Sequence, residues 1–260
     1  MRHFFIEPSH LAGCRASLFG AEARHIKNVL RLKPGDAVRL FDGTGVEYVG
    51  VIATMPPGKV EVTITGSETA AGCARLPVSV AQGFLKEKKM DRLVRQLSEL
   101  GAARWMPFIS ARSVARPEGG RVQARQERWR KIAVEALKQC RRGDLMQIDD
   151  IVGFDRLIER APACDLRIVF WEQTCEPLTA QRFSGSPAGP ASVLIVLGPE
   201  GGLAEEEVRA AVAAGFISAS LGPRILRAET AAVAACAIVQ HLFGDLGAGE
   251  KNLDKDQGLA

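Results

Sequence analysis

Two glycine-rich corners contain the residues of this sequence that are best placed to do chemistry. The first, Leu197-Gly198-Pro199-Glu200-Gly201-Gly202, lies between an apolar run at 193–197 and a helix that opens at Ala204. The second, Leu221-Gly222-Pro223-Arg224-Ile225-Leu226-Arg227, follows an apolar run at 217–221. Glycines at the end of a strand let the main chain approach a ligand closely, and the amides that open a helix can bind it. We place both corners at the C-terminal ends of neighbouring strands, where open α/β sheets bind ligands.

The charges at the first corner indicate which kind of ligand it takes. The corner lacks the G-x-G-x-x-G order of dinucleotide sites and the G-K-[ST] of phosphate-binding loops. Four carboxylates, Glu200 and Glu205 to Glu207, crowd the position that a phosphate would occupy. The last three also have a purely structural explanation, because acids in a first turn stabilise a helix. A polyanionic ligand is therefore disfavoured, whereas a ligand with an adenosine part and a positive charge fits, and S-adenosylmethionine, a sulfonium, is one.

The composition argues against several other chemistries. Six cysteines and four histidines are dispersed without a C-x-x-C pair, so the sequence predicts neither a metal site nor a disulfide framework. The 260 residues are 47% hydrophobic and 25% charged, as in ordinary globular proteins. No apolar run reaches the ~18 residues that span a bilayer, and no signal-peptide core follows Met1. We expect a cytoplasmic protein without a membrane or metal partner.

Basic residues gather in the middle of the chain. Residues 86–142 contain sixteen Lys or Arg against six Asp or Glu, whereas residues 143–260 contain nine against seventeen. The spacing predicts a helix over 121–142 with one apolar face. Its opposite face carries a basic stripe broken by Glu135, consisting of Arg121, Arg125, Arg128, Lys131, Lys138 and Arg142. This stripe, with Arg112 and Arg116 in the preceding loop, is either a solvated face or, as we favour, a surface that contacts nucleic-acid phosphates.

The elements that must position these residues divide into two parts. Residues 1–70 read as short strands with tight turns and one helix-like stretch near 21–30, which predicts a small β-barrel domain. A small, polar linker is expected at 66–75. Residues 75–245 alternate strands with helices, which predicts an α/β domain with a mostly parallel sheet covered on both faces. Residues 246–260 are polar, and we expect them to form a mobile tail.

The last predicted helix, over 231–243, is apolar nearly all round and rich in small residues. A helix of this kind must be buried in a core or against another subunit. Its apolar surface exceeds what the sheet of one subunit should cover. We therefore expect a homodimer whose active site lies near the subunit boundary.

The two corners together closely resemble the RsmE family of SPOUT-class methyltransferases, which make 3-methyluridine in 16S ribosomal RNA of the small subunit. The resemblance rests on the first corner and on the second corner extended through Ala228-Glu229-Thr230-Ala231. Weaker support comes from His25-Ile26-Lys27-Asn28-Val29-Leu30-Arg31, Phe41-Asp42-Gly43-Thr44-Gly45 and Lys88-Lys89-Met90-Asp91, so that nearly the whole chain is covered. The resemblance implies an α/β fold with a SPOUT-type parallel sheet and a C-terminal trefoil knot, preceded by a PUA/OB-like β-barrel, and an obligate homodimer.

The resemblance also implies what the protein acts on. The expected activity is methylation of uridine N3 with S-adenosyl-L-methionine as cofactor, and the expected substrate is 16S rRNA within the assembled small ribosomal subunit. Cofactor contacts are expected from both corners, at Leu197, Gly198, Pro199, Glu200, Gly201, Gly202, Leu221, Gly222, Ile225, Leu226 and Arg227. RNA contacts are expected from Arg31, Arg112, Arg116, Arg125 and Arg128.

Methylation at N3 requires that the uracil lose a proton and that the resulting anion be stabilised. The candidates are Glu200 and Glu229 for the acid–base role and Arg227 for the anion. Each has a structural alternative. Arg227 and Glu229 could form an ion pair that organises the turn into the last helix, and Glu200 could be a cap within the knot.

Two other function classes remain open. An RNA-binding ribosome assembly protein without catalysis would be favoured by a broken Gly-Pro motif, but both motifs are intact. A nucleotide enzyme that cradles phosphates is disfavoured by the acids after Gly198 and by the missing lysine.

Overall fold

The computed structural model describes residues 2–70, 76–117, 120, 122–174, 176–179 and 189–247. The chain divides into two compact units. The first comprises Met1–Cys73 with Leu137–Leu145, and the second Ala74–Ala136 with Met146–Ala260. Residues 137–145, which the sequence placed in the second domain, thus belong to the first unit. The predicted tail lies outside the described residues from position 248 onward.

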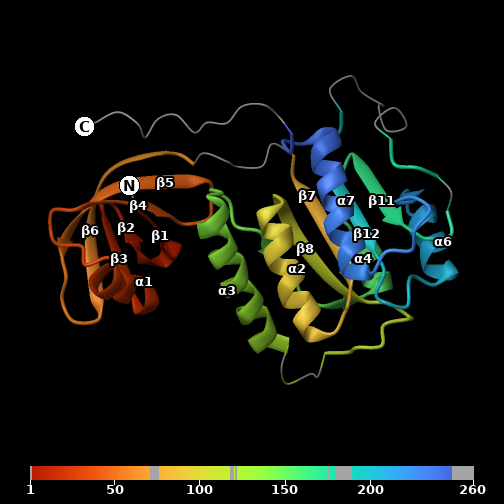
Figure 1. Cartoon of the computed structure of the whole chain (residues 1–260), viewed down its shortest axis with the longest axis horizontal. Helices are drawn as coiled ribbons and strands as arrows, with labels where there is room; N and C mark the ends of the chain where they lie inside the picture. The colour runs from red at the N-terminus through yellow and green to blue at the C-terminus, as the bar shows by residue number, and fades with distance from the viewer. Residues whose placement is uncertain are drawn as a thin grey trace. The chain divides into compact units, whose positions relative to one another are not determined.

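The first unit is built on a six-stranded sheet with the order β1-β4-β5-β6-β3-β2 (Figure 1). Its strands are β1 (Arg2–Phe5), β2 (Leu11–Ala12), β3 (Arg15–Phe19), β4 (Ala37–Phe41), β5 (Val46–Thr54) and β6 (Lys59–Thr69). All pairs are antiparallel except β1 with β4. Short helices complete the unit: η1 (Pro8–His10), α1 (Gly20–Arg24) and η2 (His25–Val29). Val60 and Val62 alternate along β6 with more exposed residues and are buried in the unit's core.

Among the described strands the edges of this sheet, β1 and β2, do not pair with each other. One sequence expectation for this unit needs correction. Residues 66–69, expected in a linker, continue β6 because they pair with Val46–Val49 of β5. The rest of that linker, 71–75, lies outside the described residues.

The second unit contains a parallel sheet with the order β10-β8-β7-β12-β11-β13, and β9 pairs with β8. Its strands are β7 (Val78–Gly83), β8 (Ala102–Ile109), β9 (Gln147–Ile148), β10 (Val152–Gly153), β11 (Leu166–Phe170), β12 (Val193–Leu197) and β13 (Ile217–Ala219). Every residue of β7 and β12 is buried, as expected for strands with helices on both faces. The predicted parallel α/β sheet is therefore confirmed.

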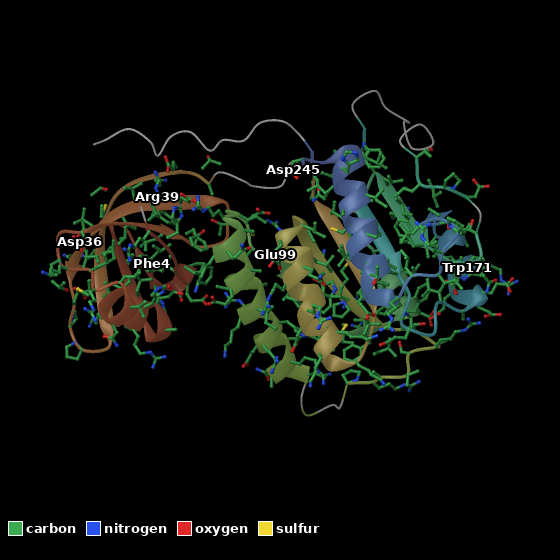
Figure 2. The ribbon with its side chains drawn as sticks, viewed as in Figure 1. Phe4, Asp36, Arg39, Glu99, Trp171 and Asp245 are labelled. Atoms are coloured by element: carbon green, nitrogen blue, oxygen red, sulfur yellow. The ribbon has the colours of Figure 1, made fainter. Side chains whose placement is uncertain are left out.

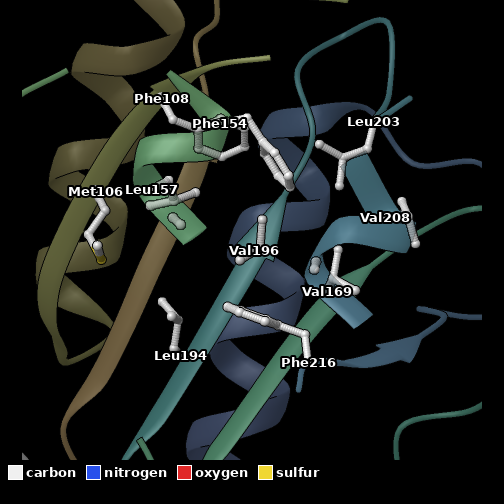
Figure 3. Packing of buried hydrophobic residues seen from close by; sticks show 12 residues of the cluster. Met106, Phe108, Phe154, Leu157, Val169, Leu194, Val196, Leu203, Val208 and Phe216 are labelled. Carbon is white, nitrogen blue, oxygen red and sulfur yellow. The ribbon is translucent and has the colours of Figure 1, made fainter. Parts of the chain in front are cut away.

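Helices cover the two faces of this sheet. The helices are α2 (Glu87–Glu99), α3 (Val122–Cys140), α4 (Phe154–Glu159), α6 (Glu205–Ala213) and α7 (Ala228–Phe243). On one face, α4 and α6 pack on Met106, Phe108, Leu194 and Val196 (Figure 3). Trp105 precedes Met106 in β8 and therefore faces the opposite side of the sheet, where it packs edge-on against Trp129 of α3. No helix in the described part of the chain has the length and apolar character needed to cross a membrane.

The strand order corrects one expectation about the site. The two corners were predicted to follow neighbouring strands, but β11 lies between β12 and β13. Strand order depends on long-range pairing that the local sequence pattern does not encode. The C-terminal end of β11 therefore lies between the two corners.

Candidate functional site

The first corner is a tight main-chain turn that packs against the end of β7. A Cβ atom at Gly198 would lie 2.9 Å from the main chain of Gly202 and of Leu203, so no side chain fits without moving the turn. A Cβ atom at Gly83 would lie 2.5 Å from the nitrogen of Pro199. The glycines at both strand ends are thus required by close contact between main-chain segments.

A buried amide at the end of β7 lies directly against this corner. The Nε2 of Gln82 donates hydrogen bonds to the carbonyl oxygens of Gly198, at 2.8 Å, and Gly83, at 3.0 Å. These two acceptors fix the orientation of the amide, so the carbonyl Oε1 points the other way. That oxygen is buried and has no hydrogen-bond partner in the described part of the chain. An unpaired buried acceptor is costly, and it fits a ligand that brings an N–H donor to the corner.

The end of β11 supplies the third side of the site. Gly202 has a φ of +71°, and a Cβ atom there would lie 2.6 Å from Oε1 of Glu172. Trp171, labelled in Figure 2, has a buried indole nitrogen without a hydrogen-bond partner among the described residues. Gln82, Trp171 and Glu172 were not predicted from the sequence. Gln82 lies near the end of β7, and Trp171 and Glu172 follow β11. These positions indicate a common site only once the order of the strands is known.

The acidic first turn of α6 does not crowd one phosphate position, contrary to the sequence expectation. Glu207 is buried and accepts hydrogen bonds from the Ser110 hydroxyl at 2.9 Å and the Ala111 amide at 2.9 Å. It also accepts from the Ala204 amide at 2.8 Å, which caps the helix. Glu205 and Glu206 are exposed and lie 3.6 and 3.3 Å from the guanidinium of Arg209. These three carboxylates stabilise the helix and the 110–113 loop, so of the four only Glu200 remains available to the site.

The structure brings the two candidate catalytic carboxylates together through a lysine. The ammonium of Lys89, in the first turn of α2, lies 3.2 Å from Oε1 of Glu200 and 3.1 Å from Oε2 of Glu229. The three side chains are partly exposed, at 30%, 29% and 19%. They come from the start of α2, the first corner and the start of α7, so three distant segments converge on one point. Lys89 belongs to a motif of the family resemblance, but its role was not predicted from the sequence.

This contact shifts the pKa values of two of the groups. The hydrogen bond to Glu229 is the main reason that the pKa of Lys89 is raised above its ordinary value. Partial burial works to raise the pKa of Glu229, but hydrogen bonds from its own amide and from Lys89 outweigh this and hold the pKa below the ordinary value. Lys89 is therefore a cation and Glu229 an anion at neutral pH.

The second corner is more open than the first. Gly222 has a φ of +104°, and a Cβ atom there would meet nothing within 4 Å. The side chain of Ile225 is 88% exposed. Arg227 is the exposed N-cap residue of α7. Glu229 forms its ion pair with Lys89 and none with Arg227 in the described part of the chain, although the charge of Arg227 also lowers the pKa of Glu229. Glu200 does not cap a helix either, because the cap of α6 is formed by Glu207.

The residues expected to contact RNA differ in their surroundings. Arg31, Arg112 and Arg116 are exposed. Arg125 is half-buried, with its guanidinium carbon 5.3 Å from the centre of the Phe84 ring, and burial lowers its pKa. Arg128 is exposed but forms an ion pair with Asp91 at 2.7 Å.

Some cations of the basic stripe have acidic partners that the sequence analysis did not include. Lys138 pairs with Glu22, and Arg142 is buried and pairs with Asp144 at 2.7 Å. Arg121 lies outside the described residues. The sequence pattern could not show these partners because Glu22 is distant in the chain and Asp144 lies beyond the helix. Arg128, Lys138 and Arg142 of the stripe are therefore paired with acids of the protein itself.

Comparison with known protein families assigns both units. Residues 73–240 match the RNA methyltransferase domain family, and residues 19–65 match the RNA methyltransferase PUA domain family. The chain is 32% identical over 248 residues to ribosomal RNA small subunit methyltransferase E of Bacillus subtilis, which covers 93% of this chain and 96% of that protein.

Two solved structures that hold a cofactor are similar over nearly the whole chain. The ribosomal RNA small subunit methyltransferase E of Neisseria gonorrhoeae bound to S-adenosyl methionine has a TM-score of 0.81, 28% identity and coverage of 94% of this chain and 99% of that one. A Legionella pneumophila structure with the bound cofactor SAM has a TM-score of 0.80, 28% identity and coverage of 94% and 98%. This chain therefore belongs to the RsmE family of RNA methyltransferases, with an N-terminal PUA domain.

Proposed function

We propose that this protein methylates ribosomal RNA of the small subunit, using S-adenosylmethionine as methyl donor. The observation that carries the proposal is made at the first glycine-rich corner. There the buried Oε1 of Gln82 has no hydrogen-bond partner among the described residues, and glycines leave the main chain without side chains. S-adenosylmethionine has amino groups that suit such an acceptor. Its positive charge suits a site bordered by the carboxylates of Glu172, Glu200 and Glu229.

The residues of both corners would hold the cofactor. When bound, it supplies a methyl group made electrophilic by the sulfonium. The amides and glycines of residues 197–202 provide a close-fitting surface, and Leu221, Gly222, Ile225, Leu226 and Arg227 provide an open one. The end of β11 lies between them, so Trp171 and Glu172 join the proposed contacts.

Uridine N3 is the proposed methyl acceptor. The contacts of Lys89 with Glu200 and Glu229 give this proposal a chemical basis. A uracil that loses its N3 proton carries negative charge on O2 and O4, and the Lys89 ammonium or the exposed guanidinium of Arg227 would stabilise that charge. Glu229 has a lowered pKa and is thereby a weak base, so its role is to hold Lys89 in place. Glu200 is the proposed proton acceptor, directly or through water.

Three further features complete the proposal. The family resemblance implies a C-terminal trefoil knot around the corners and a homodimer. The half-buried apolar residues Val233, Ala234, Ala237 and Ile238 on the outer side of α7 would contact the partner subunit. RNA contacts are assigned to Arg31, Arg112, Arg116, Arg125 and Arg128. The proposed substrate is 16S rRNA in the assembled small subunit, and such a substrate places the protein in the cytoplasm.

The test uses small ribosomal subunits from a strain that lacks this protein. Mass spectrometry of their 16S rRNA should show one uridine without its N3 methyl group, and the purified protein with S-adenosylmethionine should restore it. Calorimetry should show binding of S-adenosylmethionine and none of ATP. If RNA binds but no methyl group is added to naked rRNA or to subunits, the protein is an assembly factor without catalysis.

A further inference from the structure

The outer sides of α2 and α3 border a groove of about 460 Å³ that the activity proposed above leaves unexplained. The helices lie side by side, since Trp129 of α3 donates a hydrogen bond from its indole to Asp91 of α2 at 3.1 Å (Figure 1). Five basic and two acidic side chains line the groove with one apolar one: Lys88, Arg92, Arg95, Arg128 and Lys131, then Asp91 and Glu135, then Ile132. The groove is thus strongly basic.

Helix periodicity explains why these cations form two rows. Met90, Leu93, Val94 and Leu97 of α2 are fully buried, which turns the intervening positions outward. Lys88, Arg92 and Arg95 follow one another in steps of four and three, so they form one row about 10 Å long at a rise of 1.5 Å per residue. Arg128 and Lys131, three residues apart on α3, form the second row.

Most of these cations are not neutralised by the protein itself. Asp91 is already engaged at both oxygens, by the indole of Trp129 and by Arg128 at 2.7 Å. Lys88, Arg92, Arg95 and Lys131 are exposed and form no ion pair within the part of the chain that the structure describes. Four exposed cations without ion-pair partners repel one another, and a polyanion relieves that repulsion.

The groove begins next to the candidate active site. Lys88 lines the groove, and its chain neighbour Lys89 contacts Glu200 and Glu229. A polynucleotide that follows the groove to the start of α2 would therefore end one residue from the lysine that contacts these carboxylates.

We propose that this groove binds the sugar-phosphate backbone of the RNA segment that leads to the methylated nucleotide. The proposal rests on the proposed function, and it assigns Lys88, Arg92, Arg95 and Lys131 to the substrate in addition to the arginines named above. Phosphates are the fitting ligand because the groove offers guanidinium and ammonium groups and only one apolar side chain, which leaves little for bases to stack on.

The test compares the full-length protein with the double variant Arg92→Gln/Arg95→Gln. Affinity for a transcript of 16S rRNA is measured over a range of salt concentrations. Each lost phosphate contact lowers the slope of log affinity against log salt by roughly 0.7 to 0.9, so the double variant should lose about twice that. Affinity for S-adenosylmethionine, measured by calorimetry, should stay the same because neither residue lies at the corners.

The matched control is the double variant Arg156→Gln/Arg160→Gln. Arg156 lies in α4 and Arg160 follows its last residue. Both arginines are exposed and form no ion pair within the described ranges. It removes the same charge from another surface and should keep the wild-type slope. An equal loss in control and groove variants overturns the proposal, since net charge alone would explain it. An unchanged slope in the groove variant also overturns it, while rRNA methylation by the wild type would still support the proposed function.

A third comparison separates RNA from an acidic protein partner. If the groove variant methylates assembled subunits poorly but binds naked rRNA as the wild type does, the groove contacts a ribosomal protein and the proposal is wrong. A wild-type protein that neither binds nor methylates rRNA would instead refute the proposed function itself.

Discussion

At the scale of single residues, the position of Lys89 between two carboxylates determines how the site can work. A lone lysine near Glu200 and Glu229 could serve as a base only if its pKa were lowered, but the contact with Glu229 raises it. Lys89 is therefore fixed as a cation that neutralises one of the two acids. The remaining negative charge is available to a sulfonium or to a proton from the substrate.

Replacement of this cation gives the first prediction. Lys89→Met leaves two carboxylates close together without the charge that a uracil anion needs, so the methylation rate should fall by about 100-fold or more. Lys89→Arg keeps the charge with another geometry and should retain part of the activity. Rates are measured on small subunits that lack the modification. A Lys89→Met rate within twofold of the wild type would exclude a role for this cation.

The same contact makes a prediction about pH. Glu229 has a pKa below its ordinary value of 4.5, so the stabilisation from its ionised form is complete above pH 4.5 and is lost as the pH falls through the lower folded pKa. Lys89 has a pKa above 10.5, so its contribution is complete below that pH and is lost as the pH rises through the higher folded pKa. Between these limits the pair persists.

In Lys89→Met, the hydrogen bond and charge that lower the pKa of Glu229 are removed while its partial burial remains. The pKa of Glu229 should therefore rise. The decrease in unfolding free energy on acidification should then be smaller than in the wild type. Urea unfolding at a series of acidic pH values measures this difference. Identical acid profiles for the two proteins would show that Glu229 does not depend on Lys89.

At the scale of elements, the two corners use glycine for different reasons. At Gly198 an added carbon meets the main chain of Gly202 and Leu203, whereas at Gly222 it enters open space from a backbone with φ of +104°. The sequence pattern showed two similar Gly-Pro corners and did not distinguish these causes. Only the first glycine is needed for the packing of the corner itself.

Valine substitutions should separate the two causes. Gly198→Val should reduce both the unfolding free energy, by about 1–3 kcal/mol or more, and the affinity for S-adenosylmethionine, because the turn must move. Gly222→Val costs about 1–3 kcal/mol of backbone strain, and it should block the cofactor by filling open space at the second corner. Urea unfolding and calorimetry measure the two effects.

Gly58→Val is the matched control, since Gly58 has a φ of +72° and nothing lies within 4 Å of an added carbon. It should show the strain without any loss of cofactor affinity. Gly222→Val with unchanged affinity would place the cofactor away from the second corner.

The elements themselves were largely predictable, whereas their partners were not. The alternation of Val60 and Val62 in β6 and the spacing of Met90, Leu93 and Val94 in α2 identify a strand and a helix locally. Glu207 reads as an ordinary first-turn acid, and its hydrogen bond to Ser110, 97 positions away, has no local signal. The place of β11 between the corners is missed for the same reason, because strand order is a long-range property.

At the scale of the whole molecule, α7 connects the site to the proposed dimer. Its inner side, at Ala232, Ala235, Cys236 and Val239, is buried in the second unit. Its outer side carries Val233, Ala234, Ala237 and Ile238, which are apolar and only half-buried. Apolar side chains on both sides of a helix indicate a second apolar surface beside it. Glu229 lies in the first turn of the same helix, so a partner on the outer side would be close to the site.

The dimer gives the final prediction. Light scattering at low micromolar concentration should give twice the chain mass of 28.0 kDa. Ala234→Glu places a charge at the centre of the outer side, where burial against a partner would be costly, and should shift the mass toward one chain and lower activity. Ala213→Glu, the same substitution at an exposed position in α6, should leave the mass unchanged. A wild-type mass near 28.0 kDa with full methylation would show that one subunit is sufficient.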